Sequence, residues 1–440
     1  IYNNLADFDP RTGKFLKLGE QITNLNNPDG NNFAPRVSLA WSMSPKTVIR
    51  AGFGVFYGEP RGSEFSSFPL SPPFVIDQTV VSNPLVPNLI GNLFQIPVVR
   101  DPVGHQILQS QTVNVFSLDP NFRTNYTYDW NFTIQREIMH NVLLEVGYVA
   151  NSAHKLTGRS LVNQAVLDPD PTHPTPVVTR RPNPNIADVS MIEALDNSNY
   201  HSLATKLNKR FSNGFSLLGA YTYSKAMGIG GALFGDQSRQ QSGYNRAAEY
   251  AALEFNQTQR LTLSWIYELP FGKGKLVGSN LAGVAAGLVG GWSFQGAYTA
   301  HTGFPLTPVS GVSSNVGRQD SNRANRICDG NLDAGSRALS RWFDTSCFPD
   351  HKFGVFGNSG NGVIGGPGVN NFDLALMKNT AIPIGRSEPA TLQIRGEFFN
   401  AFNHASFGEP GLTTGTAQFG IIRTTSIPGR QIQLGLKILF

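Results

Sequence analysis

Charge is scarce in this sequence, and long apolar runs are missing. Charged residues make up 15% of the 440 residues, whereas an ordinary soluble domain has about 25%. The longest apolar run, residues 281–289, is less than half of the roughly 20 residues that a membrane-spanning helix needs, so a helical membrane protein is excluded. With 46 glycines and 11% aromatic residues, the composition favours a β-barrel, whose strands alternate outward-facing and lumen-facing side chains. A large soluble β-sandwich or propeller is the alternative.

Cysteine is almost absent. Cys328 and Cys347 are the two cysteines, and both lie in a polar segment with the composition of a loop. A lone pair of this kind is typical of a disulfide formed in an oxidising compartment, and two free thiols are the alternative. Because no histidine stands at ligand spacing, the pair makes a poor metal site.

Signals for catalysis and for nucleic-acid binding are also lacking. The net charge of +5 and the pI near 9.1 come from scattered basic residues, which argues against a nucleic-acid partner. The histidines form no zinc-protease pair, and no nucleophile elbow is present. The string at residues 360–365 matches the dinucleotide fingerprint, but no strand–turn–helix context surrounds it. We therefore predict neither an enzyme nor a bound cofactor.

What the sequence does contain is alternation with a period of two residues. In Thr47–Tyr57, Ile49 and Phe53 fall on one face and Arg50 on the other, whereas a helix would mix these sets. Strands of about ten residues favour a bilayer crossing over the shorter strands of most soluble sheets. Eleven such strands are predicted, at residues 33–43, 47–57, 126–137, 141–150, 201–211, 215–224, 259–269, 292–301, 371–381, 391–400 and 431–440.

The connections between these strands alternate between short and long. Short turns are predicted at residues 44–46, 138–140, 213–214, 271–291 and 383–389, and long loops at 58–125, 151–200, 225–258, 302–370 and 401–430. Short periplasmic turns and long extracellular loops are typical of outer-membrane barrels. This parity directs the last strand toward the periplasm. It makes residues 1–32 the remnant of an extracellular loop and residues 33–440 the barrel portion.

Eleven is an odd number of strands, and the first strand has an open edge. Backbone groups left unpaired against lipid cost several kcal/mol each. The chain also starts at Ile1 with no signal peptide. We therefore expect further strands upstream in the natural protein; the alternative is that the strand count is wrong by one.

Several strings are spread in order along the chain: FAPR at 33–36, TVIRAGFG at 47–54, WNFTIQR at 130–136, EVGYV at 145–149, NYHSL at 199–203, YTYSK at 221–225, EFFNAFNH at 397–404 and RQIQLGLK at 430–437. Together they resemble the barrel of Oar-like TonB-dependent receptors. Such receptors have a 22-stranded barrel filled by an N-terminal plug. The resemblance implies an all-β, antiparallel transmembrane barrel, of which this chain is the C-terminal half, in the outer membrane of a Gram-negative-type bacterium. The plug and the TonB-contacting segment are absent from the chain.

The final strand carries a candidate assembly signal. Its alternating apolar residues resemble the signal by which the outer-membrane assembly machinery binds a precursor strand, since an edge strand with a free terminus can pair by β-augmentation. The alternative is an ordinary amphipathic strand that ends in phenylalanine. The residues are Ile432, Leu434, Leu436, Ile438 and Phe440.

Charges within the predicted strands are candidates for the barrel lumen, because a cation at the lipid midplane costs roughly 2–4 kcal/mol. They are Arg50, Glu145, Arg395, Glu397 and Lys437. Pairing with other protein groups is the default expectation for them, and contact with a substrate or a plug is the alternative.

These features together predict an outer-membrane receptor that passes an unknown ligand, with TonB-linked energy coupling supplied by the missing N-terminal parts. The expected partners are outer-membrane lipid, the assembly machinery, the TonB complex through the plug, and the ligand. One alternative is a surface adhesion or protein-export factor with the same barrel. Another is a soluble β-rich carbohydrate-binding module.

Overall fold

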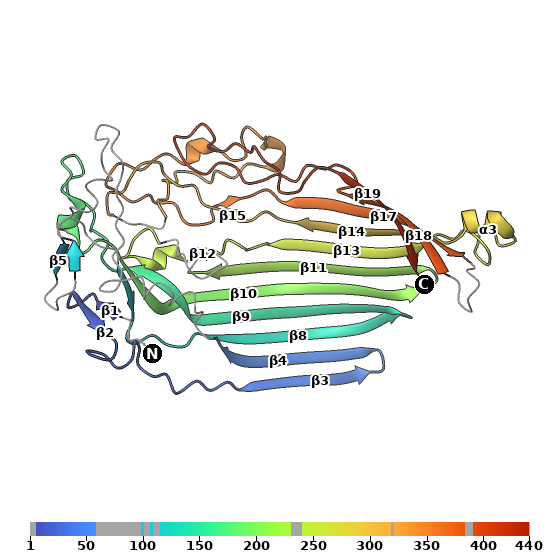
Figure 1. Cartoon of the computed structure of the whole chain (residues 1–440), viewed down its shortest axis with the longest axis horizontal. Helices are drawn as coiled ribbons and strands as arrows, with labels where there is room; N and C mark the ends of the chain where they lie inside the picture. The colour runs from blue at the N-terminus through green and yellow to red at the C-terminus, as the bar shows by residue number, and fades with distance from the viewer. Residues whose placement is uncertain are drawn as a thin grey trace.

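Eleven long strands form one continuous antiparallel sheet. The computed structural model describes residues 6–58, 98–100, 106–108, 115–229, 240–317, 321–382 and 390–439. Each long strand pairs with the next long strand along the chain, so the sheet is a meander (Figure 1). In this order the strands are β3 (Arg36–Ser44), β4 (Thr47–Tyr57), β8 (Tyr126–Met139), β9 (Val142–Leu161), β10 (Val189–Ser212), β11 (Phe215–Gly228), β13 (Gln259–Glu268), β14 (Trp292–His301), β17 (Val369–Ile382), β18 (Ala390–Phe399) and β19 (Gln431–Leu439).

All eleven strands predicted from period-2 alternation are present, and β4 and β14 have the predicted bounds. The prediction was wrong for part of the loop at residues 151–200. There β9 continues to Leu161 and β10 already begins at Val189. The pairing of these extensions shifts register on both sides of Asp196. Such irregularities break the two-residue alternation, so the sequence pattern does not predict these extensions of β9 and β10.

The remaining elements are short and lie in the connections. A helix, α3 (Gly283–Val289), occupies the longest of the short turns (Figure 1). Among the described residues, no helix is long and apolar enough to cross a membrane. The other strands are β1 (Ala6–Asp9), β2 (Lys14–Lys17), β5 (Val98–Arg100), β6 (Gln106–Leu108), β7 (Val115–Leu118), β12 (Ala251–Ala252), β15 (Pro305–Leu306) and β16 (Ile364–Gly365), and 3-10 helices cover Val177–Arg180, Arg246–Glu249, Ala334–Ser336 and Thr345–Cys347.

Asparagine and glycine close two of the short turns. Asn213 and Gly214 have φ of 52° and 75° between β10 and β11, and Asn141 has φ of 64° between β8 and β9. These left-handed conformations are accessible to glycine and asparagine at low cost and match the twist of a tight hairpin. The predicted turn at residues 383–389 lies outside the described residues.

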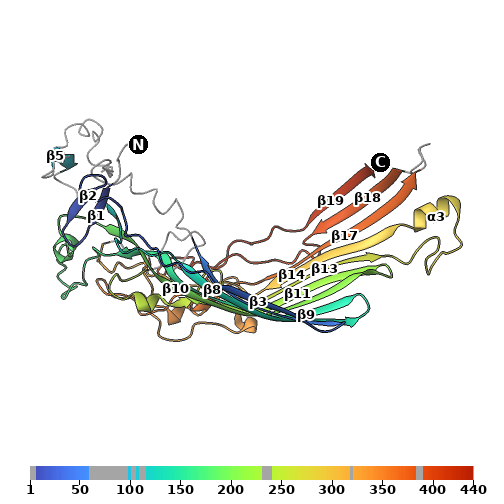
Figure 2. The same ribbon diagram turned by 90° about the horizontal axis from the view of Figure 1, so that it is seen from below.

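Strand register gives the sheet one polar and one apolar face, because directly opposite residues in an antiparallel ladder point the same way. The sheet is curved as well as twisted (Figure 2). The polar face is formed by the rows that contain Arg50, Thr133, Glu145, Lys206, Thr222, Thr262, Gln295, Asp373, Glu397 and Gln433. The apolar face is formed by the rows that contain Phe53, Trp130, Val146, Leu203, Leu217, Leu263, Phe294, Leu374, Ile394 and Leu436.

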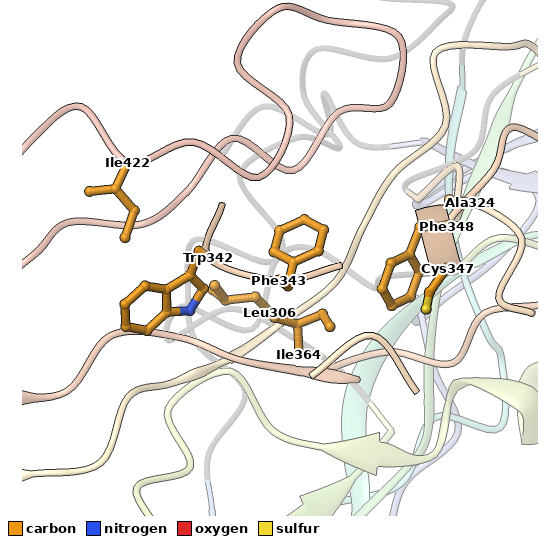
Figure 3. Close-up of a cluster of buried hydrophobic side chains, with 8 residues drawn as sticks. All are labelled: Leu306, Ala324, Trp342, Phe343, Cys347, Phe348, Ile364 and Ile422. Atoms are coloured by element: carbon orange, nitrogen blue, oxygen red, sulfur yellow. The ribbon is translucent and has the colours of Figure 1, made fainter. Parts of the chain in front are cut away.

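The long connections fold into a layer of their own, which we call the loop crown and define as the described parts of residues 161–189, 240–258, 302–368 and 400–430. Its apolar core contains Phe343, Phe348 and Trp342 (Figure 3). Phe343 is 0% exposed, and the Trp342 indole nitrogen donates to the Gly365 carbonyl at 2.9 Å. The segment at residues 302–370, predicted as a plain loop, therefore contributes packed structure.

The N-terminal segment, predicted as the remnant of a loop, contains the β1–β2 hairpin. Phe8 is buried against Val115, Ile186 and Val189. The backbone amide of Leu118 donates to the Asp7 carboxylate at 2.9 Å. The hairpin is therefore docked on β7, which in turn pairs with the first residues of β10.

Candidate functional site

The five charges chosen from the sequence all project from the polar face. Strand pairing places Arg50 opposite Thr133 and Glu145 opposite Gln135, and the row of Glu145 continues across the sheet. On the last two strands, Glu397 lies opposite Gln433, so that Arg395, Glu397 and Lys437 share this face. Strand parity alone was enough to predict that the five residues lie on one face. Which of them are neighbours could be read only from the register of the paired strands.

Arg50 and Glu145 belong to one hydrogen-bonded group. The Arg50 Nε donates to Gln135 Oε1 at 3.3 Å, and the Gln135 amide donates to Glu145 Oε2 at 2.5 Å. Lys206 lies directly opposite Glu145 on β10. Opposite charges at directly paired positions attract each other by roughly 0.2–1 kcal/mol. This group joins four neighbouring strands with alternating basic, amide, acidic and basic side chains.

Arg395, Glu397 and Lys437 form a separate group at the other edge of the sheet. The Arg395 guanidinium lies 3.7 Å from the Glu397 carboxylate, and Lys437 lies opposite Gln393. Both members of the ion pair are partly exposed, so the pair contributes little to stability. The structure therefore divides the five predicted residues into two groups that lie on the first four and the last two strands.

A cavity of about 520 Å³ on the polar face lies between β10 and β18 and includes polar residues that the sequence prediction missed. Arg210 and Asp373 line it together with Glu397. The Asp373 carboxylate accepts from the Asn371 amide at 3.0 Å and from the Asn400 backbone amide at 2.8 Å. Both missed residues have the parity of the polar face, but only the register across six strands shows that they share a hollow.

A buried ion pair connects distant parts of the loop crown. The side chains of Glu249 and Arg323 are both 4% exposed and in direct contact. The Asn361 amide also donates to Glu249 at 2.9 Å, and the backbone amide of Gln241 donates to its other oxygen at 3.0 Å. A buried carboxylate that is both paired and hydrogen-bonded has its desolvation largely offset. The crown is thus held by a polar network around the Glu249 carboxylate as well as by its apolar core.

Two further features tie the crown together. Cys328 and Cys347 are joined by a disulfide across a separation of 19 residues. Closing a loop of this length lowers the entropy of the unfolded chain and so stabilises the folded state by about 3 kcal/mol. Gly357 allows a close backbone approach, because a Cβ there would lie 1.9 Å from the carbonyl oxygen of Arg323. The loops of the crown are therefore cross-linked and closely packed against one another.

The pKa values of two carboxylates outside the main sheet are shifted in opposite directions by their surroundings. Hydrogen bonds from the Ser310 and Thr414 hydroxyls hold the pKa of Asp350 below its usual range. Burial raises the pKa of Asp7 from 3.8 to about 6, although three hydrogen bonds to its carboxylate oppose the shift. Among the residues that the structure describes, no group of three or more His, Cys, Asp or Glu side chains could hold a metal ion.

The described residues of the candidate assembly signal lie on the apolar face of β19. Leu434 is 82% exposed and Leu436 is 70% exposed, although both are strongly apolar. Ile432 and Ile438 share their parity, while Phe440 lies outside the described residues. In the part of the chain that is described, β19 pairs on one side only, with β18, and β3 pairs only with β4.

The sheet has an apolar face and an opposite polar face, and large packed loops lie at one end of it. Comparison with known families assigns this architecture. The family model of the outer membrane β-barrel domain matches residues 1–433. The chain belongs to this family. No curated protein is detectably similar to it.

Solved structures that resemble this chain include an outer-membrane transporter, an iron transporter and a siderophore receptor. YddB from Escherichia coli has 12% identity and a TM-score of 0.46, covering 93% of this chain and 40% of its own. The FrpB iron transporter from Neisseria meningitidis has 12% identity and a TM-score of 0.41, covering 96% and 40%. The siderophore receptor PirA from Acinetobacter baumannii has 8% identity and a TM-score of 0.41, covering 93% and 41%. The barrel domain spans about two fifths of the length of these proteins.

Membership in the outer membrane barrel family places the protein in the outer membrane and explains the exposed apolar face. Without a lipid neighbour, side chains such as Leu203 and Phe132, 48% and 47% exposed, would be in contact with water. Against lipid they require no cover. The apolar face is therefore the lipid-facing surface of the barrel domain.

Proposed function

We propose that this barrel domain is part of a receptor that captures a ligand on its loop crown and passes it along the polar face of the sheet. In a closed barrel that face lines the lumen. The observation that carries the proposal is the combination of two features: a packed crown with a buried polar network, and a charged sheet face that contains a cavity. A passive structural barrel requires neither.

The polar face would hold the ligand or a plug through exposed, hydrogen-bonded charges. Arg50, Gln135 and Glu145 offer both signs of charge within one row of contacts. Arg210 and Asp373 do the same in the cavity. Mixed polar surfaces suit repeated weak contacts, which allow a solute to enter and to leave.

The energy source and the assembly route are part of the same proposal. The resemblance to Oar-like receptors supports coupling to the TonB complex through an N-terminal plug. The exposed edge strand β19 supports recognition by the outer-membrane assembly machinery, because its backbone groups and its apolar residues are both accessible for β-augmentation.

The test is a comparison of solute uptake by three strains: wild type, a strain that lacks this gene, and a strain with inactivated TonB. Each is grown in the same rich medium, and the depletion of small molecules from the medium is measured by mass spectrometry. We expect at least one solute that both altered strains deplete more slowly than wild type, because capture and energy coupling would both be required.

Other outcomes separate the alternatives. Unchanged depletion in the gene deletion, together with reduced surface attachment or reduced protein secretion, would support an adhesion or export factor and contradict uptake. Slower depletion in the gene deletion but not in the TonB strain would support a passive channel. Re-expression of the intact gene is the control for effects on membrane integrity.

A further inference from the structure

Between the loop-side row of Tyr57 and the short turns, the ionisable side chains other than tyrosine on the lipid-facing surface of the sheet are basic. The acidic side chains of the long strands between the loop-side row of Tyr57 and the short turns all project from the polar face. They are Asp129, Glu137, Glu145, Glu268, Asp373 and Glu397. The lipid face instead has basic groups at its two ends: Arg136, Lys209 and Lys378 beside the short turns, and His154, His201 and Lys225 beside the loops.

The two basic ends differ in what they already bind. At the short-turn end, the Lys209 ammonium donates to the carbonyls of Ser212 and Phe215, and the Lys378 ammonium donates to the carbonyls of Gly287 and Gly290. Lys209 thus closes the turn between β10 and β11, and Lys378 holds the connection between β13 and β14. At the loop end, Lys225 is exposed beside a set of side chains that are oriented by one another.

His201 and Lys225 form the centre of this loop-end set. They lie directly opposite each other on β10 and β11, so both side chains project from the lipid face. The Tyr148 hydroxyl is 2.7 Å from His201 Nδ1, which fixes the imidazole ring and leaves its Nε2 edge for other contacts. The Trp130 ring packs edge-on at 6.1 Å from the imidazole centroid.

A chain of hydrogen bonds extends the set along the rim. His154 Nε2 lies 3.0 Å from the Ser152 hydroxyl, and that hydroxyl donates to Asn199 Oδ1 at 2.8 Å. Asn199 is two residues before His201 on the same face. Lys155 lies 5.6 Å from the centroid of the Tyr126 ring. We call Ser152, His154, Lys155, Asn199, His201 and Lys225 the outer rim patch.

We propose that the outer rim patch binds the phosphate of an outer-leaflet glycolipid headgroup. The patch is on the surface that only lipids reach, at the level where aromatic residues mark the headgroup region. Its charges are all basic, so the complementary ligand is an anion, and basic groups at this depth attract anionic lipid heads. The Nε2 edge of His201 and the second amide hydrogen of Asn199, whose first donates to the Tyr250 hydroxyl at 3.3 Å, lie on the same face as Lys225 and suit the several acceptor oxygens of a phosphate monoester.

The experiment measures lipid binding to the intact protein in mild detergent by native mass spectrometry. The probes are synthetic diphosphorylated lipid A and the same lipid without phosphates. We expect the wild-type protein to bind the phosphorylated lipid about tenfold more tightly. The double variant H201Q/K225Q should lose this preference, since the patch would lose the Lys225 cation and the His201 ring nitrogen that faces away from Tyr148.

Matched variants separate a specific patch from general charge and from misfolding. R260Q removes a cation near the same end of the sheet but on the polar face, and the preference should be unchanged. K225R retains the charge and should retain the preference. Equal binding of the two lipids by wild type, or a retained preference in H201Q/K225Q, would overturn the proposal. Heat-modifiable migration on a gel establishes that each variant is folded before binding is measured.

Discussion

At the scale of single residues, burial decides which charges matter for stability. Arg323 and Glu249 are in contact at 4% exposure each, whereas Arg326 and Asp329 form an ion pair at 33% and 70% exposure. Coulomb interactions are screened at the surface but not inside the crown. The two arginines are only three positions apart in the sequence and cannot be distinguished there.

Replacing Arg323 with alanine should destabilise the loop crown by roughly 3–5 kcal/mol, because it leaves Glu249 buried without its partner. Limited proteolysis as a function of temperature measures the effect as cleavage within the crown at a lower temperature. Arg326→Ala is the matched control and should cost no more than about 1 kcal/mol. Equal cleavage profiles for the two variants would contradict this account of the buried pair.

Asp7 should make docking of the β1–β2 hairpin dependent on pH. Burial raises its pKa from 3.8 to about 6, so the folded state binds the proton more tightly than the unfolded state. Its stabilising contribution is complete below about pH 4 and is lost as the pH rises through about 6, a change on the order of 3 kcal/mol.

Hydrogen exchange at the Leu118 amide, corrected for the intrinsic rate at each pH, measures this effect. We expect stronger protection at pH 5 than at pH 7 in the wild-type protein and a flatter profile in Asp7→Asn. Protection that increases with pH in the wild-type protein would show that the sign is wrong.

At the scale of elements, two-residue parity decides which substitutions a strand tolerates. On β19, Leu434 and Gln433 are neighbours in sequence but project from opposite faces. The strand predictions succeeded because this parity is a local property. They failed for the extensions of β9 and β10, where the register shifts on both sides of Asp196.

Leu434→Arg should destabilise the barrel domain by roughly 2–4 kcal/mol, because it places a cation on the lipid face near the middle of the strand. Gln433→Arg should have much less effect, since its side chain stays on the polar face. The yield of heat-modifiable protein in the outer membrane measures both. A yield that falls equally for the two variants would contradict the assignment of faces.

At the scale of the whole molecule, the alternation of short and long connections predicts the orientation in the membrane, with the short turns in the periplasm. Among the described residues, β3 and β19 are the two edges of the main sheet. Both run toward the short-turn end, because the chain reverses direction an even number of times between them. Purely antiparallel closure between these edges therefore requires an odd number of further strands.

A cysteine at position 339 in the crown should react with a membrane-impermeant maleimide on intact cells, and one at position 273 in a short turn should not. The variants are Leu339→Cys and Lys273→Cys, both at exposed positions. Both should react after the outer membrane is made permeable, and the protein with only its native disulfide is the unlabelled control. Reaction of Lys273→Cys on intact cells would reverse the orientation.

The amino-acid sequence by itself determined the strands, their faces and their order, because alternation along a strand and the length of a turn are local properties of the chain. Tertiary structure alone decided which polar residues meet. The contact of Glu249 with Arg323, the cavity that Arg210 shares with Asp373, and the outer rim patch around His201 all join residues from different strands or loops. Register and loop packing set these contacts through interactions distant in sequence, so no pattern along the chain reports them.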